Sequence, residues 1–314
     1  MTPAYRPWAR EVIRSLSFEL EMANLWIGLC KGHPGLPQSV AQLGYRLKWI
    51  GHKFRVTAGG HVCPDAMAAS TAIEHTLLLE FKGGANIEDD QAIAYGTIAS
   101  TDLERAGLIE EAASRSHDIV YVGEEAHGGR LRQGLTAVGC DYPLLLRADS
   151  GLGHEGGTFI NAKVSAVLSP LLSIDWSAVP TNYIPVDEAS PLSMVASVVV
   201  PRLLQYANED REDVTIVKVC EDICTVWGAL GGPAKDQFKA RVLVMLREAA
   251  SLELRNFVEV SQNGTRITLK MNPVGLAPEA RTQNLKALRT AQRQLLSRLS
   301  QLESSGQLSF PFEP

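Results

Sequence analysis

The sequence contains few cysteines, and their arrangement excludes several classes of protein. Five cysteines are scattered over 314 residues, and an odd, dispersed set does not suit the disulfide framework of a secreted protein. Cys220 and Cys224 lie one helical turn apart, but no second Cys or His pair at zinc-finger spacing accompanies them. This usage indicates a reducing compartment, so we expect a cytoplasmic protein.

Long hydrophobic runs are also missing. The longest apolar stretch, residues 192–204, is interrupted by Pro201 and Arg202 and is too short to span a bilayer. The first residues lack the apolar core of a secretory signal. With 45% hydrophobic and 21% charged residues, the composition indicates a globular protein of two or three domains without a membrane partner.

Charge is unevenly distributed along the chain. The net charge is −5, yet residues 231–300 hold twelve Lys or Arg and five Asp or Glu, a net of +7 that leaves −12 for the rest. Such asymmetry indicates that the basic part meets a polyanion, although a solvated basic helix face is the alternative.

The pattern of the first half predicts an α/β sandwich with a mixed sheet. A helix over residues 8–29 ends at a loop rich in Pro and Gly, and residues 38–50 show the apolar spacing of a second helix. Further helices are expected over residues 87–106, capped by Asn86, and 130–137. Strands are expected over residues 53–58, 61–66, 75–81, 118–123 and 142–147, and the uninterrupted apolar residues of the third indicate a central strand.

The second half changes character. Helical stretches over residues 192–206, 214–230 and 236–252 precede a hairpin with Asn263-Gly264 at its turn, an order that resembles a winged-helix domain. We therefore divide the chain into an N-terminal helical segment (1–37), an α/β core (38–150), a Gly-, Ser- and Pro-rich connector (151–190), a winged-helix-like domain (191–275), and a C-terminal helix and tail (276–314).

Three charged residues of the α/β core indicate a catalytic site. Asp65 follows Pro64 at a strand end, and Glu80 and Lys82 end the next strand in the chain. Alternation in an extended chain places Glu80 and Lys82 on one side while Phe81 points into the core. Two carboxylates on neighbouring strands suit Mg²⁺. A lysine beside them can orient or deprotonate water, or offset charge on a phosphate.

Asp65 followed by Glu80-x-Lys82 resembles the signature of the PD-(D/E)XK nuclease superfamily, whose members have the restriction-endonuclease-like fold. Gln91 and Tyr95 extend the resemblance, since RecB-type relatives carry Gln-x-x-x-Tyr on the following helix, with both residues on one face.

The resemblance covers residues 38–148 and implies a deoxyribonuclease dependent on Mg²⁺ or Mn²⁺. Asp65 and Glu80 would bind the metal, Lys82 would act on the attacking water, and Gln91 and Tyr95 would support the site. The superfamily often adds an acidic residue from the first helix. Glu19 and Glu21 are both candidates, and the sequence selects neither.

A competing motif, Gly-x-Gly-x-x-Gly over residues 151–156, matches the dinucleotide-binding pattern. No complete βαβ unit surrounds it, so a flexible glycine-rich connector is the simpler interpretation.

The winged-helix-like domain is expected to bind DNA phosphates through basic residues of its third helix and its wing, namely Lys239, Arg241, Arg247, Arg266 and Lys270. A domain that docks a protein partner is the alternative. In the last helix, leucines at spacings of three and four form a seam. It either pairs two chains as a homodimer or packs back on the body.

Two functions remain open. The first is a Mg²⁺-dependent nuclease, whose arrangement resembles nucleases of bacterial defence or mobile-element systems, where partner proteins are common. The second is a catalytically inactive nuclease-like scaffold that serves as a DNA-binding or assembly subunit. The intact triplet favours the enzyme, because a scaffold has no physical need for two carboxylates and a lysine that converge.

Overall fold

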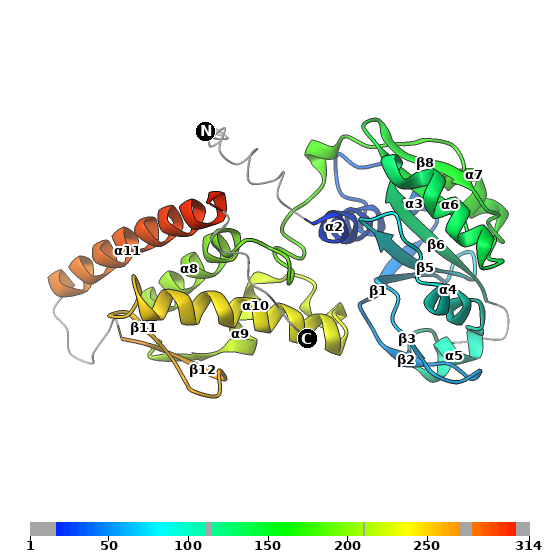
Figure 1. Cartoon of the computed structure of the whole chain (residues 1–314). Coiled ribbons are helices and arrows are strands. Elements are labelled where there is room, and N and C mark those ends of the chain that lie inside the picture. Colours follow the sequence, from blue (N-terminus) through cyan, green and yellow to red (C-terminus); the bar gives the residue numbers. More distant parts are fainter. Residues whose placement is uncertain (1–16, 111–114, 210, 271–277, 306–314) are drawn as a thin grey trace. The chain divides into compact units, whose positions relative to one another are not determined.

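The computed structural model describes residues 17–110, 115–209, 211–270 and 278–305. Contacts within the chain divide it into two units, each with its own core. The N-terminal unit comprises Ser17–Tyr183 and Gly228–Lys235, and the C-terminal unit comprises Ile184–Trp227 and the described residues from Asp236 onward (Figure 1). The first sixteen residues, where the expected first helix would begin, lie outside the described part.

A seven-stranded mixed sheet forms the centre of the N-terminal unit. The middle strands β5, β6 and β7 run parallel, and the strands on either side join antiparallel. The mixed α/β architecture expected from the sequence is therefore confirmed. In spatial order the strands are β1 (Tyr45–Ile50), β4 (Ala66–Ser70), β5 (His75–Lys82), β6 (Ser116–Glu124), β7 (Leu144–Ala148), β8 (Gly151–Gly156) and β9 (Leu172–Ser173).

Strand β5 is the central strand that its composition predicts. Every residue from His75 to Phe81 is buried, and only Lys82 at its end is partly exposed. It pairs with β4 at one edge and with β6 at the other, and its two buried faces call for apolar side chains.

Helices cover both faces of the sheet (Figure 1). Helix α2 (Phe18–Lys31), capped by Ser17 and ended by Gly32 with a φ of +64°, contacts β1 and β5. The opposite face packs against α4 (Asp89–Gly96), α5 (Ser100–Arg105) and α6 (Gly128–Ala137). The core of that face joins the helices to strands β4–β7 through residues that include Leu78, Tyr95, Tyr121, Leu131 and Leu144.

Residues 38–50 do not form the single helix that was expected. Helix α3 covers only Ser39–Gln42, and Gly44, with a φ of +81°, turns the chain into strand β1. The apolar spacing fits both periods over so short a stretch. Pairing with β4, together with the strand preference of Tyr45 and Trp49, decides for the strand.

The strands expected over residues 53–58 and 61–66 are short and lie outside the main sheet. They form a separate hairpin of β2 (Phe54–Arg55) and β3 (His61–Val62), turned by Gly59 and Gly60, both at positive φ. The expected helix over residues 87–106 is two helices, α4 and α5, and Glu88 rather than Asn86 stands at the N-cap position.

The connector was expected to contain one short helix, and α7 (Ala162–Leu168) lies within it. The expectation is wrong for β8 and β9, which extend the sheet. Gly151 has a φ of +141°, and a Cβ there would overlap the carbonyl of Leu172 on β9. The glycine is thus required by the close approach of two strands, not by flexibility. The segment is an antiparallel strand, so no dinucleotide-binding turn exists there.

The C-terminal unit alternates helices with a small antiparallel sheet of order β10-β12-β11. The expected hairpin is confirmed, with Gly264 at a φ of +69° in its turn. The elements are α8 (Leu192–Asn208), β10 (Asp213–Thr215), α9 (Ile216–Ile223), α10 (Gly232–Ser251), β11 (Val258–Val260), β12 (Arg266–Leu269) and α11 (Pro278–Ser304).

The leucine seam of α11 packs within its own unit. Leu288, Leu295 and Leu299 are buried, and α11 contacts α8. Glu303 accepts hydrogen bonds from the backbone and hydroxyl of Ser193. Of the two arrangements left open for the seam, this is the one in which the helix packs back on the body. Over the described ranges no helix is long and apolar enough to cross a membrane.

The close approach of β8 and β9 predicts a large difference between two neighbouring glycines. We expect Gly151→Ala to lower the free energy of unfolding by more than about 2 kcal/mol. Gly153→Ala should change it by less than about 1 kcal/mol, because a Cβ at that position would have its nearest neighbour, on Leu171, 4.0 Å away. Urea denaturation measures both, and equal effects would contradict the close-approach account.

Candidate active site

Strand pairing brings Asp65 and Glu80 together. Asp65 directly precedes β4, and Ala66 pairs with Leu79 of β5, so the carboxylate lies beside the carboxyl-terminal end of β5. Asp65 therefore lies immediately before the first residue of a strand, whereas the sequence interpretation placed it at the end of one. Glu80 and Lys82 share one face of β5, and Phe81, which is buried, occupies the other.

Asp65 is held by the backbone of the neighbouring strand. Its Oδ2 accepts a hydrogen bond of 2.6 Å from the amide of Phe81. Burial, and then the nearby charge of Glu80, raise the pKa of Asp65 well above its ordinary value, and the Phe81 amide and Lys82 only partly oppose this. Without a cation, the ionised form of Asp65 is therefore disfavoured by burial and by the charge of Glu80.

Glu80 has a partner for each oxygen. Lys82 Nζ lies 3.0 Å from Oε1, and the Tyr95 hydroxyl donates to Oε2 at 2.6 Å. Glu80 is only 3% exposed, and burial raises its pKa despite these two partners. This carboxylate is therefore fixed in orientation before any ligand arrives.

Gln91 closes the network from helix α4. Its Oε1 accepts from Lys82 Nζ at 3.2 Å, and its Nε2 donates to the Tyr95 hydroxyl at 3.0 Å. Lys82, Glu80, Tyr95 and Gln91 thus form a ring of polar contacts between β5 and α4. The sequence interpretation assigned a supporting role to Gln91 and Tyr95, and the structure places both against the triplet.

Lys82 carries its positive charge in this setting. Burial alone would lower the pKa of Lys82, but Glu80 and then Glu88 outweigh it, and the pKa is raised. Its Nζ lies 3.5 Å from Glu88 Oε1, a largely exposed carboxylate. A protonated lysine is suited to stabilising negative charge, and less suited to removing a proton from water.

The structure distinguishes the two acidic candidates of the first helix. Glu19 Oε1 accepts a hydrogen bond of 3.2 Å from the amide of Gly83, next to Lys82, and its charge adds to the raised pKa of Asp65. Glu21 instead pairs with Arg147, whose Nε lies 3.0 Å from Oε2. Glu19 therefore belongs to the site. The sequence could not show this, because the contact depends on how α2 packs on the sheet.

Tyr121 is a further residue that the sequence interpretation missed. It pairs with Glu80 across β5 and β6, and its ring stacks on Tyr142 with centroids 5.9 Å apart. Its hydroxyl is buried and has no hydrogen-bond partner within the described part of the chain, a position that an ordered water would satisfy. A tyrosine inside an apolar strand is the only signal the sequence offers.

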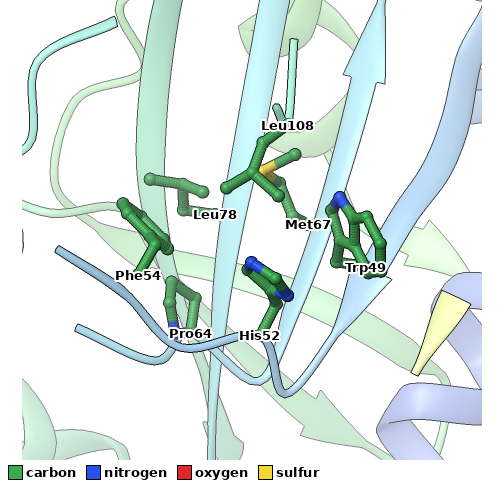
Figure 2. Close-up of a pocket in the computed structure, with 7 residues that line it drawn as sticks. All are labelled: Trp49, His52, Phe54, Pro64, Met67, Leu78 and Leu108. Atoms are coloured by element: carbon green, nitrogen blue, oxygen red, sulfur yellow. The ribbon is translucent and has the colours of Figure 1, made fainter. Parts of the chain in front are cut away.

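An apolar hollow lies beside Pro64, the residue before Asp65. Figure 2 shows the side chains around it. The ring centroids of Trp49 and His52 lie 4.6 Å apart. The hollow holds no more than about one water, so a nucleotide does not fit. Its packing positions the start of β4, and it is lined by Trp49, His52, Phe54, Pro64, Met67, Leu78 and Leu108.

The donor set fits a hard divalent cation. Asp65 and Glu80 supply carboxylate oxygens at one point, and Mg²⁺ commonly binds one or two carboxylates and keeps several waters. Across the described ranges, no group of three or more His, Cys, Asp or Glu side chains is placed to hold a metal ion. Burial raises the pKa of both carboxylates, and a bound cation would favour their charged forms.

Most of the basic side chains expected to bind DNA form ion pairs or hydrogen bonds with other residues of the C-terminal unit. Lys239 pairs with Asp236 at 2.7 Å, Arg266 with Asp213 at 3.0 Å and Lys270 with Glu259 at 2.8 Å. Arg241 donates from Nε to the carbonyl of Ser190 at 2.7 Å and is partly buried. Arg247 is exposed, and it donates to the carbonyl of Gln262 at 3.3 Å.

Comparison with known proteins gives one match. Residues 19–125 match the model of a family described as the MJECL32 domain, and this range is about a third of the chain. The matched range begins at Glu19 and includes the residues of the candidate active site, namely Asp65, Glu80, Lys82, Gln91 and Tyr95. No curated protein and no solved structure matches the chain.

The raised pKa of Asp65 predicts how stability depends on pH. A carboxylate whose pKa is raised by folding favours the folded state below its ordinary pKa of about 4. That contribution is lost as pH rises through the raised pKa. In chelator at pH 8, we expect Asp65→Asn to raise the unfolding temperature by about 2–4 °C, the shift that about 1 kcal/mol gives in a domain of this size.

The stabilisation should disappear near pH 4, where the wild-type carboxylate is protonated. Asp149→Asn is the matched control, since Asp149 is exposed on the same unit and should leave the unfolding temperature unchanged. Thermal unfolding followed by circular dichroism measures all three proteins. A loss of stability in Asp65→Asn at pH 8 would show that the ionised carboxylate does not destabilise the folded state.

Proposed function

We propose that the chain is a metal-dependent nuclease of the PD-(D/E)XK type that hydrolyses phosphodiester bonds of DNA. The observation that carries the proposal is the convergence of Asp65, Glu80 and Lys82 at adjoining strand ends, inside a ring of contacts that Gln91 and Tyr95 complete. Five residues chosen from sequence motifs alone lie close together, and this proximity supports the proposal.

The order of elements supports the same fold. Helix α2 is followed by three antiparallel strands, β1, β4 and β5, then by helices α4 and α5, and then by β6, which is parallel to β5. Apart from the short helix α3 (Ser39–Gln42) and the separate β2–β3 hairpin, this order is compatible with a restriction-endonuclease-like core. Strands β7, β8 and β9 extend that core at the β6 side.

The C-terminal unit supports DNA as the substrate. Its order of helix, short strand, two helices and hairpin agrees with a winged-helix-like domain. The internal ion pairs of Lys239, Arg266 and Lys270 reduce the charge available there. Arg247, Arg266 and Lys270 are all exposed, and of these three Arg247 forms no ion pair among the described residues.

Each site residue has a distinct task in this proposal. Asp65 and Glu80, with Glu19 beside them, would hold Mg²⁺ or Mn²⁺, which when bound supplies an acidified water and charge for the phosphate oxygens. Tyr95 and the Phe81 amide keep the two carboxylates in place through single hydrogen bonds, which leaves other lone pairs of those oxygens for ligands.

Lys82 would stabilise the reacting phosphate. Hydrolysis joins a water oxygen to phosphorus and breaks one phosphorus–oxygen ester bond, and a proton from the water passes to the leaving oxygen. Negative charge grows on the phosphate during this exchange, and a protonated lysine fixed by Glu80 and Gln91 can offset it. Pre-oriented charge of this kind needs little rearrangement during the reaction.

Cleavage by site variants tests the function. We expect the wild type to cut plasmid, linear or single-stranded DNA with Mg²⁺ or Mn²⁺, and Glu80→Gln and Lys82→Ala to be slower by at least about 100-fold. Gel analysis of a mixed DNA panel provides the measurement. Variants as active as the wild type would refute the site. A wild type that binds DNA but cuts nothing under any of these conditions would instead favour the inactive scaffold.

The two acidic residues of α2 form a matched pair for a second test. Glu19→Gln should slow cleavage by about 10-fold or more and raise the metal concentration needed for half-maximal rate, because it removes a carboxylate beside Asp65. Glu21→Gln changes the same charge two residues away, at the Arg147 ion pair. Equal rates for the two variants would exclude Glu19 from the site.

A further inference from the structure

The last helix of the C-terminal unit has an exposed face without acidic residues. Between Glu279 and Glu303 the sequence contains no Asp or Glu, although it contains five basic residues. Glu303 itself is occupied by hydrogen bonds from Ser193. Helix α11 is therefore the part of this unit where positive charge accumulates without local compensation.

Three of these basic residues and two serines lie on one line along the helix, which we name the α11 stripe. Lys286, Arg289, Arg293, Ser297 and Ser300 follow each other at steps of three and four residues, and all are exposed. Such steps place side chains on one helical face. The stripe runs for 14 positions, or about 21 Å at 1.5 Å per residue.

Burial on the opposite side determines which way the stripe faces. Leu288, Leu295 and Leu299 are buried and lie about half a helical turn away from the stripe. Arg298, at the boundary, pairs with Glu248 at 2.9 Å and Glu253 at 2.5 Å. These contacts prevent rotation of α11, so the stripe is held towards solvent.

The stripe cations differ from three other basic residues of the unit that were expected to bind DNA. Lys239, Arg266 and Lys270 each have an acidic partner within 3.0 Å. Among the residues that the structure describes, Lys286, Arg289 and Arg293 form no ion pair. Their charge is thus available to an external anion at no cost of breaking an internal pair.

The chemistry of the stripe fits a phosphate backbone. Lysine, arginine and serine side chains are the usual donors to nucleic-acid phosphates. From Lys286 to Arg293 the helix rises about 10 Å, a length over which duplex DNA presents about six charges. A membrane surface is disfavoured, because no exposed large apolar side chain lies on the described part of α11.

We propose that the α11 stripe binds the phosphate backbone of DNA without reading its sequence. The surface lies on a different element from the third helix and the wing, where a winged-helix-like domain is expected to make its contacts. The inference goes beyond the proposed nuclease activity and does not depend on it, since binding through the stripe requires no cleavage.

The test compares two variants of the full chain, each with three basic side chains replaced by glutamine. Both variants and their parent carry Lys82→Ala, so that DNA is not cleaved during the binding measurement. The stripe variant is Lys286→Gln, Arg289→Gln and Arg293→Gln, which keeps helix propensity nearly unchanged. The matched control, Arg130→Gln, Lys163→Gln and Arg211→Gln, removes the same charge from other exposed side chains. Circular dichroism melts check that both variants remain folded.

Fluorescence anisotropy with a labelled DNA duplex, at salt from about 50 to 200 mM, gives affinity and salt dependence. We expect the stripe variant to lose at least about 10-fold in affinity. Its slope of log affinity against log salt should fall by about 2–3, since each phosphate contact contributes about 0.9. The control should stay within about twofold of the parent.

Three outcomes would overturn the proposal. The first is a stripe variant that binds DNA like its parent with an unchanged salt slope. The second is a control that weakens binding as much as the stripe variant, which would show an effect of net charge alone. The third is loss of binding to vesicles of anionic lipid with DNA binding intact, which would identify the stripe as a membrane surface.

Discussion

The close placement of two buried carboxylates, Asp65 and Glu80, is the constraint on which the rest of the site depends. Burial raises the pKa of both groups, and the charge of Glu80 adds to the rise at Asp65. The fold meets this cost with one backbone amide, one tyrosine hydroxyl and one lysine. Such an arrangement has no benefit for stability, which is why we interpret it as a site for a cation and a phosphate.

The surrounding elements can be understood as supports for that pair. Strand β5 is buried on both faces and paired on both sides, so Glu80 and Lys82 extend from a rigid base. Helix α4 contributes Gln91 and Tyr95, one turn apart, to hold them in register. Helix α2 brings Glu19 to the end of β5 from the other side. Three elements that are distant in sequence thus define one small volume.

Sequence reasoning succeeded where the signal is local and repeated. The apolar run of β5, the residues at its end and the Asn263-Gly264 turn all depend on neighbours within a few positions. It failed where the cause lies elsewhere in the chain. Residues 45–50 become a strand because β4 pairs with them, and Gly151 is required because β9 passes close by. Nothing near either segment reveals those partners.

The same limit applies to charge. Lys239 and Asp236 are three residues apart, so their ion pair is visible in the sequence, but Arg266 finds Asp213 across the small sheet. A count of basic residues therefore overstated the charge on the third helix and the wing. The leucines of α11 are buried, which turns its basic face to solvent. The cations of that face form no ion pair within the described part of the chain. Burial of one face decides what the other can do.

Metal binding at the carboxylate pair tests the account most directly. Titration calorimetry with Mn²⁺ should show binding to the wild type, a loss of at least about 10-fold in affinity for Asp65→Asn, and wild-type affinity for Glu21→Gln. Because this measurement needs neither DNA nor partner proteins, a missing substrate cannot hide the result. Absence of Mn²⁺ and Mg²⁺ binding to the wild type, or equal binding by Asp65→Asn, would contradict the assignment of the site.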